Sequence, residues 1–255
     1  MITEAILTKE KAVIPYVTAG LPDLDTTGEI LKVLDEAGAA AIEIGIPFSD
    51  PMADGPVLQK ASYAALQAGF SLDRLLSRLE KWSGSVRAPL IIMSYINPIM
   101  RRGIKETFSI LREKGVQGLI LPDMPLDGYE LFTMCRDSGL DLIRLVAPTT
   151  PLERQKEVVS QCSGFVYAVT VKGVTGARSS LPAEIRRQVS DIKSFTDLPV
   201  CAGFGVSNAD QVKDMLTFAD GVIVGSWLMG RIMEAEKPVM AARQMLVELM
   251  GSKRI

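Results

Sequence analysis

Short apolar runs alternate with amphipathic stretches along the whole sequence, and this alternation constrains the fold more than any other feature. The runs with the length and composition of buried strands are residues 13–18, 40–44, 90–95, 118–121, 141–146, 164–169, 199–202 and 221–224. Eight strands that alternate with helices match a parallel (β/α)8 TIM barrel, an α/β fold, better than an open sheet. With 255 residues and no linker-like segment, the sequence predicts a single domain over residues 1–255.

The segments between these runs carry helical periodicity. We expect helices at about 26–37, 57–68, 71–82, 104–114, 129–138, 151–162, 182–194 and 227–250, and one more after Ser207 or Asn208. Asp23 and Asp25 are signals for the start of the first of these helices. Ser71 is an expected N-cap, and Thr149 or Thr150 is the expected N-cap before Pro151. Residues 170–180 are rich in Gly, Ser and Thr and form the longest irregular stretch.

The overall composition argues against several classes of partner. A net charge of -2 offers no basic field for nucleic acid or for an anionic membrane. No segment approaches the roughly 18 apolar residues of a membrane span. The sequence opens without the pattern of a secretory signal, so we expect a cytoplasmic protein. Cys135, Cys162 and Cys201 are far apart in the sequence and are interpreted as reduced thiols.

Histidine is absent from the sequence. This excludes the Ser-His-Asp and Cys-His arrangements of nucleophilic catalysis. It also disfavours zinc and non-haem iron sites, which depend on imidazole, so we expect no metal. Proton transfer would therefore fall to carboxylates, Tyr, Lys or water.

The segment from Ile42 to Pro56 contains the candidate acid and base. Glu43 lies on a predicted strand, where it shares a face with the small residues Ala41 and Gly45. A carboxyl in that position is expected to lose solvent and to have a raised pKa, as an acid and base near neutral pH requires. Asp54 ends the following loop. The alternative is that an Arg or Lys elsewhere pairs with Glu43 and that the aspartates are turn residues, and the local pattern favours neither interpretation.

The loops after the seventh and eighth strands are candidate phosphate sites. Gly203-Phe204-Gly205 and Gly225-Ser226 stand where TIM barrels often bind phosphate through backbone N–H groups at a helix start. Each glycine alone could equally make a tight turn, but their joint placement favours phosphate, with Gly205, Gly225 and Ser226 as its ligands. Neither loop contains Lys or Arg, so dipoles would bind the anion.

Aromatic residues near the strand ends are the candidates for lining the site. Tyr167 alternates with Phe165 and Val169, so it should face the barrel interior beside Glu43. A core role with a satisfied hydroxyl is equally compatible with that position. Tyr16 and Tyr95 have weaker claims. Asp123 is interpreted as a turn or helix-start residue and is left out of the catalytic set.

The run Glu-x-Gly-x-Pro-Phe-Ser-Asp-Pro-x-Ala-Asp-Gly-Pro, from Glu43 to Pro56, resembles the signature of the tryptophan synthase α subunit. Matching segments recur in the family's order, and together they cover nearly the whole chain: residues 15–20, 173–176, 203–206 and 225–226.

This resemblance implies an activity and roles for particular residues. The reaction is the retro-aldol cleavage of indole-3-glycerol phosphate to indole and glyceraldehyde 3-phosphate, without a cofactor in this chain. Glu43 would transfer the protons, and Asp54 would accept a hydrogen bond from the indole N–H. Thr175 would help close its loop over Asp54, and Gly176 would contact the phosphate.

The resemblance also implies a partner, a pyridoxal-phosphate β subunit that receives indole in an α2β2 complex. The segments at Asp50-Pro51, Asn97-Pro98 and Pro122–Pro125 would face it as rigid loops. The sequence departs from the family at residues 170–172 and is shorter at residues 176–181, which bears on loop closure. Two alternatives remain: a stand-alone indole-3-glycerol phosphate lyase, and a catalytically silent α-like subunit that activates a β subunit.

Overall fold

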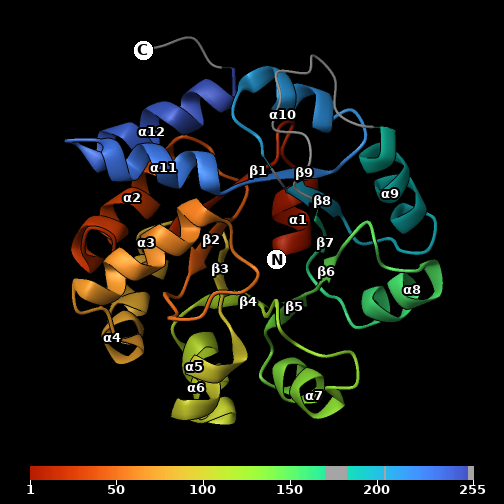
Figure 1. Ribbon diagram of the computed structural model, residues 1–255, viewed down its shortest axis with the longest axis horizontal. Coiled ribbons are helices and arrows are strands. Elements are labelled where there is room, and N and C mark those ends of the chain that lie inside the picture. The colour runs from red at the N-terminus through yellow and green to blue at the C-terminus, as the bar shows by residue number, and fades with distance from the viewer. Residues whose placement is uncertain (170–182, 204, 252–255) are drawn as a thin grey trace.

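A computed structural model describes residues 1–169, 183–203 and 205–251 of the chain. Its strands are β1 (Val13–Thr18), β2 (Ile42–Gly45), β3 (Leu90–Met93), β4 (Val116–Ile120), β5 (Asp141–Ile143), β6 (Leu145–Val146), β7 (Val166–Val169), β8 (Val200–Gly203) and β9 (Gly221–Val224). They form one sheet in the order β5-β4-β3-β2-β1-β9-β8-β7-β6. Each neighbouring pair is parallel, as the pairing β1 with β2 and β1 with β9 illustrates. Helices surround these strands (Figure 1), so the predicted TIM barrel is confirmed.

The predicted strand at 141–146 is interrupted at Arg144, and its two halves close the barrel. β5 pairs with β4, whereas β6 pairs with β7. The carbonyl of Arg144 still accepts a hydrogen bond from Tyr167 N–H at 3.1 Å. The buried Arg144 guanidinium donates to Gln161 Oε1 at 2.6 Å and to the Met124 carbonyl at 3.0 Å. The split therefore changes the strand count without opening the barrel.

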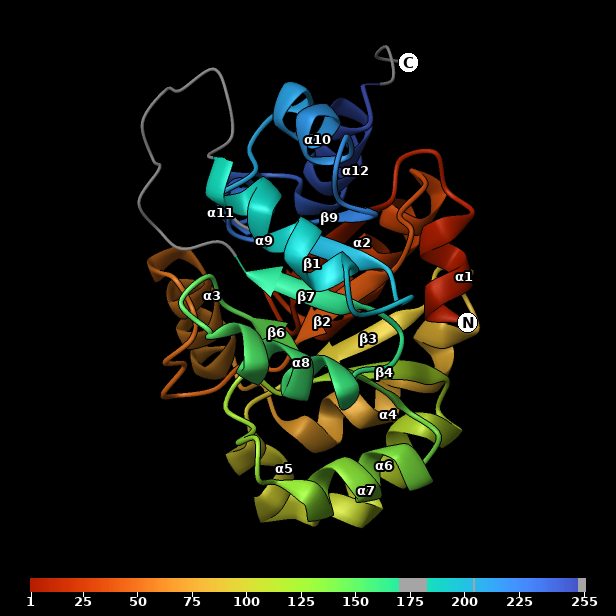
Figure 2. The same cartoon turned by 90° about the vertical axis from the view of Figure 1, so that its right-hand side faces the viewer.

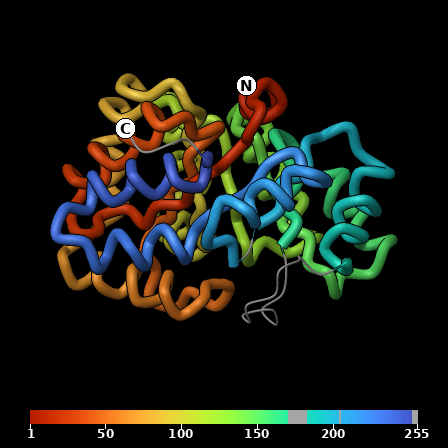
Figure 3. The backbone as a smooth tube through the Cα atoms, turned by 90° about the horizontal axis from the view of Figure 1, so that it is seen from above, coloured from red at the N-terminus to blue at the C-terminus, as the bar shows by residue number. Residues whose placement is uncertain are grey.

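The helices of the described residues are α1 (Ile2–Leu7), α2 (Leu24–Glu36), α3 (Pro56–Gln67), α4 (Leu72–Ser83), α5 (Ile96–Arg102), α6 (Ile104–Glu113), α7 (Tyr129–Asp137), α8 (Leu152–Ser160), α9 (Ala183–Lys193), α10 (Ala209–Met215), α11 (Ser226–Glu234) and α12 (Pro238–Leu249). α12 packs beside α2 (Figure 3), so the last described helix lies against a helix from the first part of the chain. Lys11 Nζ, just before β1, donates to the carbonyl of Met250, the residue after α12, at 2.7 Å. None of the described helices is long and apolar enough to cross a membrane.

Most of the helix boundaries agree with the sequence. The side chains of Asp23, Ser71 and Asn208 accept hydrogen bonds as N-caps, and the last predicted helix divides before Pro238. The prediction of Thr149 or Thr150 as an N-cap is wrong. Pro151 itself has an extended backbone, with ψ at 148°, so α8 begins one residue later and has no side-chain cap.

Two helices were not expected from the sequence. α1 lies at the end of the barrel where the strands begin (Figure 2), and its Ile2 and Ile6 are buried there. A Cβ at Gly118 would lie 2.6 Å from Ile2 Cδ1, so glycine at this position leaves room for the Ile2 side chain of α1. α5 contains Asn97 and Pro98, which are therefore not part of a loop. Proline is tolerated there because the first turn has no intrahelical partner for its N–H.

Buried apolar residues form an inner and an outer cluster. The inner cluster includes α1 and alternate strand residues, among them Ile14, Ile91, Ile120, Ile143, Phe165 and Ile223. The outer cluster includes the intervening residues and the helix faces packed on them. Tyr167 packs against the inner cluster, as its alternation with Phe165 predicted. The strand period of two thus decides which side chains enter the barrel.

Candidate active site

Glu43 is a buried carboxyl in the wall of the barrel. Its register partners are Tyr16 on β1 and Ile91 on β3, and the residue is only 1% exposed. No described side chain makes an ion pair with it, and its Oε2 has no hydrogen-bond partner among the described residues. Burial raises the pKa of Glu43 to about 8, and the charge of Asp54 adds to the effect. The loss of solvent expected from the sequence is therefore confirmed, and the described residues do not provide the Arg or Lys of the alternative.

Asp54 is half-buried at the end of the loop from β2 to α3. Its N–H donates to the Pro51 carbonyl at 3.0 Å, which forms a turn, and its carbonyl accepts from Gln59 Nε2 at 2.9 Å. The carboxyl itself is not used in this turn. Burial raises the pKa of Asp54 to about 6, and the Tyr95 hydroxyl opposes that rise.

The two carboxyls have different protonation states near neutral pH. Between about pH 6 and pH 8, Glu43 is mostly protonated while Asp54 is mostly ionised. Such a pair offers a proton donor and a negatively charged hydrogen-bond acceptor whose charges interact. Each pKa follows mainly from loss of solvent, which penalises the charged form.

Two phenols stand beside Glu43, and a glycine makes room for each. A Cβ at Gly45 would lie 1.9 Å from the Tyr16 hydroxyl oxygen, and one at Gly203 would lie 2.7 Å from that of Tyr167. Burial raises the pKa of both phenols, and Glu43 raises them further. Both therefore stay neutral beside the acid. The predicted position of Tyr167 is confirmed, but its contact with substrate stays a prediction.

The candidate phosphate residues lie on two neighbouring loops, because β8 and β9 are paired. Gly205 has φ at +66°, which alone favours glycine, and no atom lies within 4 Å of the place that a Cβ would take. Gly225 has φ at -115° and is the N-cap of α11, whose first residue is the exposed Ser226. A Cβ at Gly225 would make only ordinary contacts, the nearest 3.5 Å from Tyr16 Cβ. Backbone geometry thus accounts for Gly205, whereas it does not require Gly225, and phosphate binding at both stays a prediction.

Two predicted site residues, Thr175 and Gly176, lie outside the described residues, as does Phe204.

Tyr95 makes a contact with the Asp54 loop that its sequence pattern did not indicate. Its hydroxyl accepts a hydrogen bond from Ala53 N–H at 2.9 Å. The only sequence signal for this contact is that Tyr95 ends a predicted strand. Asp123, left out of the catalytic set, accepts from Ile96 N–H through both carboxylate oxygens, at 3.0 and 3.1 Å, and so caps α5.

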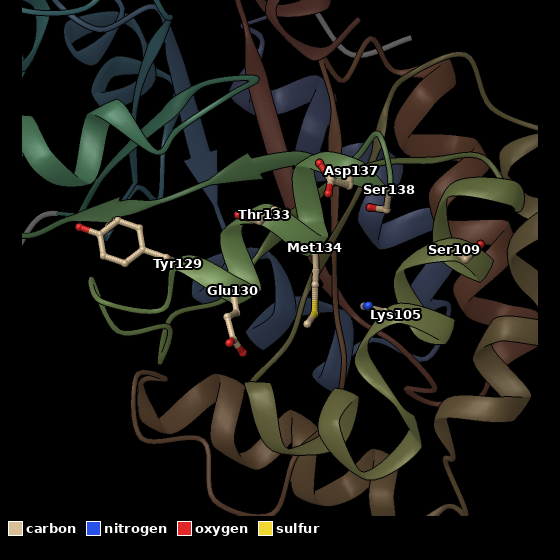
Figure 4. A pocket seen from close by; sticks show the side chains of 8 residues that line it. All are labelled: Lys105, Ser109, Tyr129, Glu130, Thr133, Met134, Asp137 and Ser138. Carbon is tan, nitrogen blue, oxygen red and sulfur yellow. The ribbon is translucent and has the colours of Figure 1, made fainter.

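The described surface also has grooves that lie outside the barrel. One lies between α6 and α7, where Lys105, Ser109, Tyr129, Glu130, Thr133, Met134, Asp137 and Ser138 line it (Figure 4). Another is lined by residues of α3 and α11 and by the start of α12. Neither groove is lined by Glu43 or Asp54. Glu43 and Asp54, rather than these grooves, therefore mark the candidate active site.

Comparisons with known proteins agree on one family. The sequence matches the family model of the tryptophan synthase alpha chain over residues 3–253. It is 44% identical over 245 residues to the tryptophan synthase alpha chain of Carboxydothermus hydrogenoformans, covering 96% of this chain and 91% of that relative. The alpha chain of a Picosynechococcus strain is 44% identical over 223 residues, with coverages of 87% and 84%.

Solved structures from Pyrococcus furiosus are similar to the present one. The tryptophan synthase A-subunit of this hyperthermophile superimposes with a TM-score of 0.88 at 36% identity, covering 94% of this chain and 98% of that chain. A chain from the a2b2 complex of the same organism gives a TM-score of 0.89 at 37% identity, with the same coverages.

Proposed function

Since this chain belongs to the tryptophan synthase alpha chain family, we propose that Glu43 and Asp54 are the acid–base pair of its reaction. The enzyme is a carbon–carbon lyase that cleaves indole-3-glycerol phosphate to indole and glyceraldehyde 3-phosphate, a step of tryptophan biosynthesis. The observation that supports the residue assignment is the buried Glu43 beside the half-buried Asp54, with pKa values on either side of neutral pH.

The reaction needs three events at the substrate. Carbon C3 of the indole gains a proton, the adjacent glycerol hydroxyl loses one, and positive charge at the indole nitrogen must be stabilised. Neutral Glu43 donates its proton to C3, and the resulting carboxylate then removes the hydroxyl proton. The electrons of that O–H bond form the carbonyl of glyceraldehyde 3-phosphate as the carbon–carbon bond breaks towards the ring. Glu43 ends the cycle protonated, as it began.

Asp54 acts on the nitrogen side of the indole. Its carboxylate accepts a hydrogen bond from the indole N–H, and this bond strengthens as positive charge develops there. In this proposal the neutral phenol of Tyr167 lines the pocket beside Glu43. Gly205, Gly225 and Ser226 bind the phosphate through N–H groups and a hydroxyl, together with Gly176. Thr175 closes its loop over the site.

These steps balance protons and electrons with the chain's own carboxyls, so we propose that the reaction uses no cofactor in this chain. Pyridoxal phosphate would belong to the partner, the β subunit of an α2β2 complex of the kind formed by the Pyrococcus furiosus relative. The cytoplasmic location expected from the sequence is part of the same proposal, and cell fractionation tests it.

An indole-release assay on the isolated chain tests the assignment. Glu43→Gln keeps the size of the side chain but cannot transfer a proton, so activity should fall about 10²–10⁴-fold or more. The matched control is Glu36→Gln, which removes an exposed carboxylate at the end of α2 and should keep parental activity. If Glu43→Gln were within a few-fold of the parent, Glu43 would not be the acid. A parent chain that released no indole, alone or with the β subunit, would favour the catalytically silent alternative.

A further inference from the structure

The loop from Pro47 to Asp54 has one cross-element hydrogen bond among the described residues. Its other hydrogen bonds are internal, such as Met52 N–H to the Asp50 carbonyl at 2.9 Å, or join it to the helix that follows. The exception is the bond from Ala53 N–H to the Tyr95 hydroxyl oxygen at 2.9 Å. The position of the loop next to Asp54 thus depends on the side chain of Tyr95, which follows β3.

An aromatic contact reinforces this bond at the other end of the loop. The rings of Phe48 and Tyr95 are 5.3 Å apart between centroids, with an interplanar angle of 31°. Tyr95 therefore contacts the loop through its ring near the beginning and through its hydroxyl near the end. Offset or tilted rings at this spacing attract one another beyond the area that they bury.

Tyr95 is itself held firmly. It is 4% exposed, and its carbonyl accepts a hydrogen bond from Ser94 Oγ at 2.8 Å. It is the N-cap of α5, and the next N–H, that of Ile96, is bound by both carboxylate oxygens of Asp123. The hydroxyl is thus fixed relative to β3 and to the loop after β4.

The hydroxyl can serve two loop groups at once. A phenol has lone pairs to accept with and one hydrogen to donate. One lone pair is engaged by Ala53 N–H, which leaves the O–H free to donate towards the neighbouring residue Asp54, whose pKa the Tyr95 hydroxyl lowers. A donor on that carboxylate favours its charged form.

From this geometry, and resting on the function proposed above, we propose that Tyr95 is a positioning residue for the reaction. Its hydroxyl fixes the loop at Ala53 and orients the Asp54 carboxylate towards the indole N–H. It acts through Asp54 and touches neither C3 nor the glycerol hydroxyl.

Tyr95→Phe tests this inference, since it removes the hydroxyl and keeps the ring. The kcat for indole release should fall about 10- to 100-fold, because small misplacements of reacting groups have effects of that order, while KM should change little. Tyr63→Phe is the matched control: Tyr63 is 66% exposed on α3, and its loss of a hydroxyl should leave kcat unchanged. Urea unfolding of both variants shows whether they remain folded.

The pH profile separates positioning from a merely structural role. Loss of the Tyr95 donor raises the pKa of Asp54, so the acid limb of kcat/KM should move up from its parental position near pH 6. The other titratable groups that interact with Asp54 are Glu43, Tyr16 and Tyr167, and Asp123 interacts with Tyr95. All are retained in the variant. An unchanged acid limb with an unchanged kcat would overturn the inference.

A double-mutant cycle completes the test. If Tyr95 acts through Asp54, then Tyr95→Phe should cost nothing further in an Asp54→Asn background. An equal loss in both backgrounds would show that Tyr95 acts elsewhere. If Asp54→Asn alone kept parental activity, the assigned role of Asp54 would fail and the inference with it. If Asp54→Asn lost activity while Tyr95→Phe did not, only the positioning role would fail.

Discussion

Glu43 should lower the free energy of unfolding as pH rises, and replacing Glu43 should show the size of this effect. A carboxyl whose pKa rises from 4.5 to about 8 on folding is neutral in the folded chain under conditions where the unfolded chain has already ionised. The folded state therefore binds the extra proton, and its stability falls as pH rises from the lower pKa through the upper one. The stability that this group provides is fully present only below about pH 4.5.

The size of this effect follows from the two pKa values. Each pH unit in the interval corresponds to about 1.4 kcal/mol, so the full loss is about 5 kcal/mol at high pH. Between about pH 5.5 and pH 8.5 the loss from this group is about 3 kcal/mol. Glu43→Gln cannot ionise, so its stability relative to the parent should increase by that amount over the same range. An unpartnered buried amide in the variant changes the stability difference between variant and parent by the same amount at every pH. The test is therefore how this stability difference varies with pH, and not its absolute size.

Urea unfolding of the parent and of Glu43→Gln at several pH values measures this slope. Glu36→Gln is again the control, because it removes an exposed carboxylate from α2 and should show no comparable trend. A stability difference between Glu43→Gln and the parent that stayed constant from about pH 5.5 to pH 8.5 would refute the reasoning. It would mean that Glu43 is not held neutral by burial in the folded chain.

Three further outcomes are expected. Asp54→Asn should lower kcat with little change in KM, because its interaction grows towards the transition state; a rise in KM alone, in steady-state kinetics, would make Asp54 a binding residue. The kcat/KM profile of the parent should be bell-shaped, with loss below about pH 6 as Asp54 is protonated and loss above about pH 8 as Glu43 ionises; a flat profile from about pH 5 to pH 9 would contradict the assigned protonation states. Gly225→Val should weaken binding of glycerol phosphate in calorimetric titration while the fold persists, and unchanged affinity would remove Gly225 from the phosphate site.

The sequence determined the barrel and the position of its chemistry. Nearly continuous apolar runs separated by helical patterns require strands buried on both faces, and a layer of helices around a parallel sheet satisfies that. The two-residue alternation of side chains along a strand placed Glu43 and Tyr167 on the inner side of the barrel, where they are found. Local cap chemistry was equally readable at Asp23, Ser71 and Asn208, because an N-cap bond joins residues only three apart.

Tertiary structure decided what depends on contacts between distant segments. α1 buries Ile2 and Ile6 only because the barrel end offers them an apolar surface, and so short a helix is marginal in isolation. Arg144, at the break in strand 141–146, bonds to groups 17 and 20 positions away. Tyr95 reaches Ala53 across 42 positions, and no local pattern encodes that hydrogen bond. The residue types that do the chemistry are thus written in the sequence, whereas the desolvation and hydrogen bonds that tune them exist only after the chain has folded.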